Sequence, residues 1–248
     1  MKEKIIGRNR DITKEEKELI DSRLTALDPF SSMDYLEILG FSEFDDLLDY
    51  VRAFGEFPMP EDFRMYIAGK YCYYLPLDTN LEKIQKLVEK YHDAGKYILD
   101  VGAGSGLMLG MLAKRLPHLK NRLLGIRMEG SPYGVDSISL FDNIIDCSFE
   151  DFIQTYDLVD EIDTIILSWP PYLEPLAHDV LKYFSEHDTI SNLIYIGEDR
   201  HGCTGDDTFF DLWDDLKEKG RIVSKRFRLE IFYGMYDFLH LIRDANGR

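Results

Sequence analysis

The sequence predicts an α/β protein in which strands alternate with helices, preceded by a helical extension and closed by a pair of strands. Three observations support this class. From residue 76 onward, short apolar runs alternate with segments whose apolar residues recur at helical spacing. A glycine-rich turn, 102–106, directly follows the apolar run 97–101. The strand-like segments 221–229 and 236–242 are joined by a turn containing Gly234, which is typical of a hairpin.

Length and charge limit the function classes. With 248 residues and 45% apolar content, the chain can bury a sizeable core. Its formal net charge of −17 opposes broad binding to duplex nucleic acid or to an anionic membrane. A local cationic cluster remains near the C-terminus, made of Lys219, Arg221, Lys225, Arg226 and Arg228.

The cysteines and the N-terminus favour a cytoplasmic protein. Cys72, Cys147 and Cys203 are scattered, without the spacing of a zinc site or a disulfide framework. The charged N-terminus lacks the apolar segment of a signal peptide, and no apolar run approaches the length that spans a membrane. We therefore expect a reducing compartment, no metal and no membrane partner.

Residues 1–75 form a predicted helical extension, and residues 76–248 form the predicted ligand-binding domain. Helices are expected from Thr13, which caps the first of them, over 33–39, over 42–54 and over 61–74. The extension is either a lid that selects substrate or a packing or dimerisation surface, and the sequence does not choose between them.

In the second region the elements follow in order. A helix capped at Thr79 or Asn80 and ended by Gly95 precedes the strand 97–101. Further strands are expected over 121–127, 143–146, 162–167 and 189–196, with helices from 107 to about 117, from 149, over 174–184 and over 208–219. The nearly continuous apolar run 162–167 is typical of a buried central strand.

The turn 102–106 has the chemistry of a ligand-binding loop. Gly102 and Gly104 can adopt positive φ and let the backbone approach a ligand, and Gly106 lets the helix begin close to the strand. A ligand in an open α/β sheet binds beyond the carboxyl end of such a strand. A tight turn without a ligand remains the alternative. Asp100 precedes the first glycine by two residues, which gives D-x-G-x-G-x-G and not the dinucleotide spacing G-x-G-x-x-G.

This pattern resembles the first motif of class I S-adenosylmethionine-dependent methyltransferases. Together with the W-P-P-Y turn at 169–172 and the I-G-E…C-T-G-D-D-x-F-F segment at 196–210, it resembles a group of class I methyltransferase-like proteins over about residues 70–242. It implies a Rossmann-like, seven-stranded methyltransferase sheet with a terminal antiparallel hairpin, and S-adenosyl-L-methionine as cofactor. The cofactor-binding positions that it implies are Tyr74, Asp100, Gly102, Ala103, Gly104, Gly106, Glu129, Asp146 and Ser168.

Some of these positions carry open alternatives. Where the family places an acid for the ribose hydroxyls, this chain has Arg127, and Glu129 is the nearest acid that can substitute. Asp146 matches the position of an adenine-binding acid, but either Asp146 or Ser148 can instead cap the following helix. Tyr74 either lies over the cofactor or is an ordinary half-buried aromatic residue.

The turn Trp169-Pro170-Pro171-Tyr172 is the predicted acceptor site. It resembles the D/N/S-P-P-Y/F motif of amino-methyltransferases, in which the first side chain accepts a hydrogen bond from the target amine. An indole donates but does not accept, so Trp169 lacks half of that function unless Ser168 or backbone carbonyls supply it. A purely structural turn is the alternative.

The loop after the next strand, 197–207, is expected to face the same site. Glu198 is a candidate general base or amine ligand, with a structural role as the alternative. His201 is expected to be solvated, and Thr204 and Asp206 are candidate helix caps.

These observations favour a methyltransferase with Trp169, Pro170, Tyr172 and Glu198 at the acceptor site. The expected acceptor is an amine on a small molecule, a nucleotide or a protein side chain, and the oligomeric state stays open. The alternatives are a non-catalytic binding protein with this fold, and a dinucleotide-dependent oxidoreductase in which Arg127 receives a 2′-phosphate.

Overall fold

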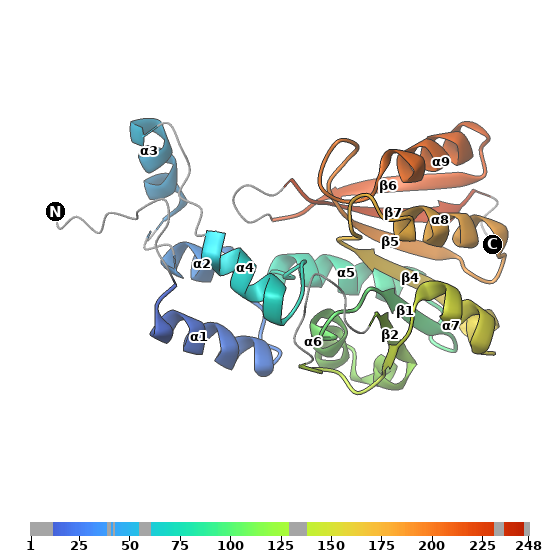
Figure 1. The fold of residues 1–248 in the computed structure, drawn as a ribbon, viewed down its shortest axis with the longest axis horizontal. Coiled ribbons are helices and arrows are strands. Elements are labelled where there is room, and N and C mark those ends of the chain that lie inside the picture. Colours follow the sequence, from blue (N-terminus) through green and yellow to red (C-terminus); the bar gives the residue numbers. More distant parts are fainter. Residues whose placement is uncertain are drawn as a thin grey trace.

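The computed structural model describes residues 12–38, 41, 43–54, 61–128, 138–230 and 236–245. These residues contain one seven-stranded sheet in the order β3-β2-β1-β4-β5-β7-β6 (Figure 1). The strands are β1 (Tyr97–Val101), β2 (Leu123–Arg127), β3 (Ile144–Asp146), β4 (Ile162–Ser168), β5 (Asn192–Gly197), β6 (Ile222–Arg228) and β7 (Phe238–Asp244).

The pairing confirms the predicted α/β class and the terminal hairpin. β1 pairs in parallel with β2 and β4, and β4 pairs in parallel with β5. β7 is antiparallel to both β5 and β6. Strand order therefore reverses at β1, with β2 on one side and β4 on the other. The point of reversal is where open α/β sheets form a crevice for ligands.

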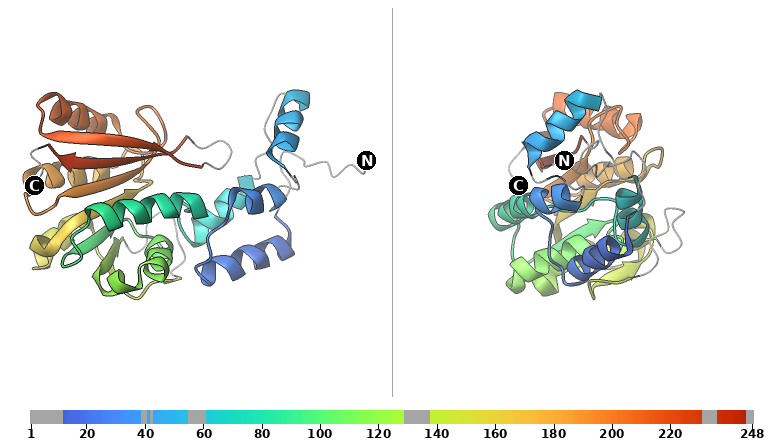
Figure 2. Two further views of the ribbon diagram at one scale, coloured as in Figure 1. Left: turned by 180° about the vertical axis from the view of Figure 1, so that it is seen from behind. Right: turned by 90° about the vertical axis from the view of Figure 1, so that its left-hand side faces the viewer.

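Helices cover both faces of the sheet (Figure 2), and alternate residues of each strand enter two separate cores. Ile98 and Leu123 pack toward α5 (Asp78–Tyr91) and α6 (Leu107–Arg115). Their neighbours Leu99 and Leu124 pack in the core that holds the buried residues of the last three helices. Those helices are α7 (Phe149–Thr155), α8 (Leu176–Glu186) and α9 (Asp207–Glu218). Period-two alternation thus places Asp100 on the α5–α6 face.

Of the helices that the structure describes, the first four lie beyond one end of the sheet (Figure 1). They are α1 (Lys14–Thr25), α2 (Ser32–Ile38), α3 (Phe44–Phe54) and α4 (Glu61–Lys70). The predicted cap of α1 is confirmed, because Thr13 and Glu16 form a reciprocal capping box.

The extension docks on α6 and on the start of α5. A Cβ added to Gly110 of α6 would lie 2.7 Å from a side-chain carbon of Leu27, so glycine permits this close contact. Lys114 donates to the carbonyl of Ala26, and the amide of Asp78 donates to the carbonyl of Phe30 at 2.8 Å. The helical extension is therefore packed against the sheet domain.

Two predicted helix ends are wrong. α5 begins at Asp78, so Thr79 and Asn80 lie within the helix and its N-cap is Leu77, which has no side-chain acceptor. Asn80 instead bonds the backbone of Glu230 through both amide atoms. The same helix ends at Tyr91, so Gly95 belongs to the following turn.

Several other predicted ranges are too long. α4 stops at Lys70 and not at 74, and β2 begins at Leu123 because a 3₁₀ helix, Pro117–Arg122, occupies the preceding residues. β5 begins at Asn192 and not at 189. Among the described residues, no helix is both long and apolar enough to cross a membrane.

Candidate cofactor and acceptor site

The glycine loop joins β1 to α6 at the point where strand order reverses. Gly102, Gly104 and Gly106 all have positive φ, at +80°, +55° and +76°. The amides of Gly102 and Ala103 both donate to the carbonyl of Ile126 on β2, at 3.0 and 2.9 Å. This pairing fixes the start of the loop against the neighbouring strand.

Two of these glycines have different surroundings. A Cβ at Gly106 would lie 2.8 Å from the Cβ of Phe141 and 3.0 Å from Cδ1 of Ile144, so this glycine lets α6 start close to these two residues. At Gly102, no described atom lies within 4 Å of an added Cβ. The loop is therefore packed tightly at Gly106 and open at Gly102, where a ligand can reach the backbone.

Asp100 is a buried acid beneath this loop. The residue is 1% exposed, and its Oδ1 has no hydrogen-bond partner among the described residues. Burial raises the pKa of this carboxyl to about 7. Buried polar atoms in proteins are nearly always hydrogen-bonded. An unpaired oxygen at this position is therefore available to a bound ligand.

The segment between α4 and α5 forms the neighbouring wall. The carbonyl of Tyr71 accepts from the amide of Ser105 at 3.0 Å, and it lies 3.2 Å from an added Cβ at Gly104. Cys72 follows, and its thiol donates to the carbonyl of Tyr74 at 2.9 Å. Burial, with a smaller contribution from Asp100, raises the pKa of the Cys72 thiol. That thiol is therefore a poor nucleophile.

Tyr74 is buried beside this wall. Its hydroxyl has no partner of good hydrogen-bond geometry among the described residues. Burial, and then the charge of Asp237, raise its pKa. Tyr74 therefore lies near both Cys72 and Asp237.

Arg127, the last residue of β2, joins β3 to the glycine loop. Its Nε donates to Oδ1 of Asp146 at 2.7 Å, and its NH1 donates to the carbonyl of Gly104 at 3.0 Å. Asp146 is thus engaged by Arg127, and the helix cap is Ser148, whose hydroxyl accepts from the amide of Asp151. The predicted substitute acid, Glu129, lies outside the described residues.

The Trp169–Tyr172 turn follows β4, whose last residue is the half-buried Ser168. The amide of Trp169 donates to the carbonyl of Ile196 at 2.8 Å, and its indole Nε1 donates to Oδ1 of Asp237 at 2.8 Å. Pro170 is buried, whereas Tyr172 is 47% exposed.

Glu198, just after β5, holds two loops together. One carboxylate oxygen, Oε2, accepts from the amide of Cys203, and Oε1 accepts from the amide of Tyr236 at 3.3 Å. Its own amide donates to Thr204 Oγ1 at 2.7 Å. This geometry supports the structural alternative for Glu198.

Three residues in the loops that follow β4 and β5 have strained backbone conformations. Trp169, Leu173 and His201 have φ values of +49°, +67° and +75°, a region that costs free energy for residues other than glycine. Such strain persists where surrounding contacts enforce it, and it concentrates at functional sites.

Sequence reasoning missed Asp237. It is 4% exposed, lies directly before β7 and accepts from the indole of Trp169, which follows β4. The pairing joins positions 68 residues apart, so no local pattern signals it. Asp206, in contrast, caps α9 as one alternative predicted. Among the described residues, no group of three or more His, Cys, Asp and Glu side chains could hold a metal ion.

Comparison with known proteins supports the fold. A solved structure of a Klebsiella pneumoniae protein assigned as an O-methyltransferase has a TM-score of 0.51 at 14% identity, and the match covers 87% of this chain and 97% of that one. M. capricolum TrmK in complex with S-adenosyl-homocysteine has a TM-score of 0.42 at 15% identity, covering 68% and 69%. At that score the second likeness carries no weight.

No protein-family model matches the chain, and no curated protein matches it in sequence. Strand order and the first of these likenesses together show that the chain has a Rossmann-like fold with a seven-stranded sheet, as does that solved structure.

Proposed function

We propose that the protein is an S-adenosylmethionine-dependent methyltransferase. The observation that carries the proposal is the combination of an open backbone at Gly102 with an unsatisfied buried carboxylate at Asp100. Both lie at the carboxyl end of β1, where strand order reverses and where this fold binds its ligands.

The residues of the site fit such a cofactor. Gly102, Ala103 and Gly104 would let it approach the loop backbone, and Asp100 would accept from a cationic or polar group of the ligand. Tyr74 and Ser168 would border it. Glu129 and Asp146 keep their predicted roles at the ribose and adenine, with Asp146 held by Arg127.

When bound, the cofactor supplies an electrophilic methyl group on a sulfonium. The protein's task is then to align the acceptor and exclude water, so catalysis is mostly positioning. Trp169, Pro170 and Tyr172 would line the acceptor position, and Glu198 would hold the loops around it. We propose an amine acceptor on a small molecule, a nucleotide or a protein side chain.

A non-catalytic binding protein is the second candidate. Two observations favour it. The Trp169 indole donates its only N–H to Asp237, and both carboxylate oxygens of Glu198 accept from backbone amides. The oxidoreductase alternative is less well supported, because the Arg127 guanidinium already bonds Asp146 and Gly104.

Calorimetric titration with S-adenosylmethionine and S-adenosylhomocysteine tests the proposal, and Gly102→Ala is the informative variant. Its methyl group would enter the open space above the loop, and we expect a loss of affinity of about tenfold or more. Gly220→Ala is the matched control, since Gly220 also has positive φ and open surroundings. Both variants carry similar backbone strain, of about 1 kcal/mol.

The outcomes separate the candidates. Binding that Gly102→Ala weakens and Gly220→Ala leaves unchanged supports the cofactor site. Binding without turnover across amine acceptors favours the non-catalytic protein. If neither ligand binds wild type, the proposal fails. A thermal shift with NADPH would then favour the dinucleotide-dependent oxidoreductase.

A further inference from the structure

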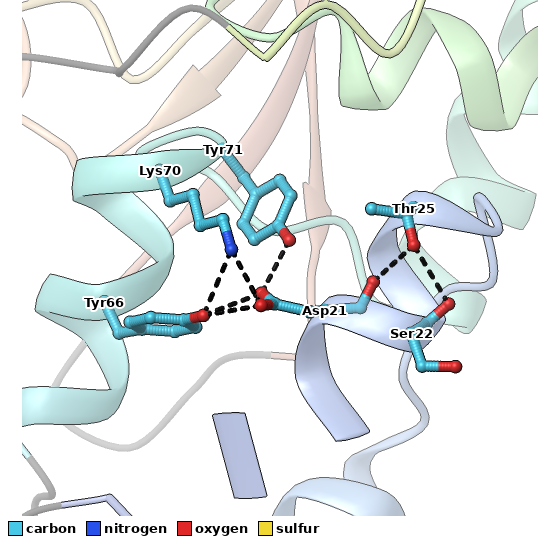
Figure 3. A network of polar contacts seen from close by, with 6 residues as sticks. All are labelled: Asp21, Ser22, Thr25, Tyr66, Lys70 and Tyr71. Atoms are coloured by element: carbon cyan, nitrogen blue, oxygen red, sulfur yellow. Dashed lines mark hydrogen bonds and ion pairs between the residues drawn. The ribbon is translucent and has the colours of Figure 1, made fainter. Parts of the chain in front are cut away.

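A network of polar side chains in the N-terminal helices is connected to the glycine loop through Tyr71. Asp21 of α1 accepts hydrogen bonds from three side chains that α4 and its end supply (Figure 3). The donors are the Tyr66 hydroxyl at 2.8 Å, Lys70 Nζ at 2.7 Å and the Tyr71 hydroxyl at 2.6 Å. We call Asp21, Tyr66, Lys70 and Tyr71 the Asp21 cluster.

The charge at the centre of this cluster is stabilised by its donors. Partial burial alone would raise the pKa of Asp21, but hydrogen bonds from Lys70, Tyr71 and Tyr66 outweigh it and lower the pKa. Asp21 is therefore ionised at neutral pH, and each of its bonds is charge-assisted. Bonds of this kind are about twice as strong as neutral ones.

Tyr71 belongs to both the cluster and the ligand site. Its side chain is fully buried and bonds Asp21, while its carbonyl accepts from the amide of Ser105 in the glycine loop. The same carbonyl lies 3.2 Å from the Cβ position of Gly104. The next residue, Cys72, lies close enough to Asp100 for that charge to raise the pKa of its thiol.

We propose that Asp21 is a positioning residue for the glycine loop. By fixing the side chain of Tyr71, Asp21 sets the position of the Tyr71 carbonyl and thereby the backbone between Gly104 and Gly106. The N-terminal helices would then help to form the cofactor site by holding its glycine loop in position. The expected effect on ligand affinity rests on the proposed function, whereas the expected effect on the position of the loop does not.

Asp21→Asn tests the inference, because it removes the charge and keeps the shape. Amide hydrogen exchange across residues 102–108 reports the Tyr71–Ser105 bond without any ligand. Losing the equivalent of one charge-assisted bond corresponds to about a tenfold rise in exchange rate, and we expect a rise of that size in the Kd for S-adenosylhomocysteine. Tyr71→Phe removes only the bond between Tyr71 and Asp21, through which Asp21 would act, and should raise loop exchange by a similar factor.

Asp34→Asn is the matched control. Asp34 is also a carboxylate of the extension and accepts from the amide and hydroxyl of Ser31 and from Arg23. Its pKa is likewise lowered against the effect of burial, yet none of these bonds involves Tyr71. The control should change loop exchange by no more than about twofold. Asp21→Glu, which keeps the charge, should restore most of the protection.

The readouts distinguish two failures. Equal exchange in Asp21→Asn and wild type would overturn the inference. Equal increases in Asp21→Asn and Asp34→Asn would also overturn it, because they would report general loosening of the extension. If wild type binds neither S-adenosylmethionine nor its product, the proposed function fails, and the exchange measurements still decide the role of Asp21.

Discussion

Replacing Asp100 by Asn should stabilise the free protein at alkaline pH and remove cofactor binding. Asp100 is 1% exposed and its carboxyl has an oxygen without a partner among the described residues, so burial penalises the ionised form. An amide of the same shape does not ionise. The substitution therefore removes this penalty and also the charge that a ligand would use.

The size of the effect follows from the pKa. In the folded protein the pKa of Asp100 is raised from 3.8 to about 7. Between these values the folded chain holds a proton that the unfolded chain releases, so the free energy of unfolding falls as pH rises through that interval and levels off above it. The two pKa values differ by about 3, and each pKa unit corresponds to 1.36 kcal/mol. The substitution can therefore raise the free energy of unfolding by at most about 4 kcal/mol. For a chain of this size that equals a rise in Tm of about 10 °C.

Urea denaturation of wild type and Asp100→Asn at pH 5 and pH 8 measures this difference. We expect the variant to be more stable than wild type at pH 8, with a smaller gap at pH 5, and to lose measurable affinity for S-adenosylhomocysteine. Asp163 is the matched control, because it is also buried but bonds His92 and the amide of Asp93. Asp163→Asn should therefore lower stability. An Asp100→Asn protein that is less stable than wild type at pH 8, or that binds ligand as tightly, would refute the reasoning.

Three further substitutions test other contacts. Arg127→Ala removes the bond to the carbonyl of Gly104 and should weaken cofactor binding severalfold in calorimetry. Tm should change little, because the ion pair between Arg127 and Asp146 is partly exposed. Unchanged affinity would show that the loop does not need this arginine. Trp169→Phe removes the donor to the buried carboxylate of Asp237 and should cost about 2 kcal/mol in urea denaturation; a cost near zero would mean that the bond does not hold the hairpin. Gly197→Ala would place a methyl group 2.5 Å from a buried threonine hydroxyl, so Tm should fall by several degrees, and a wild-type Tm would contradict the packing at the end of β5.

Local features of the sequence were sufficient to predict the sheet and the glycine loop. The positive φ of Gly102 and Gly106 follows from residue type within a turn of five residues. The run 162–167 is apolar because β4 is buried on both faces. The Thr13 cap was also predictable, since its partner Glu16 lies three residues away.

Contacts between distant residues account for what the sequence did not reveal. Asn80 is not the helix cap that it resembles, because it bonds the backbone of Glu230, 150 residues away. Asp237 and Asp21 gain their importance from partners 68 and 45–50 residues away. In each case the residue type is ordinary, and only the tertiary fold gives it a role.

The position of β7 has a consequence for how the chain is made. β7 lies between β5 and β6, although it follows both in the sequence. During synthesis β6 therefore has no neighbour in the sheet until β7 emerges and inserts, and the strand edges of β5 and β6 stay open until then. We expect a nascent chain halted before Phe238 to be prone to aggregation, and the last strand to act as the step that closes the sheet.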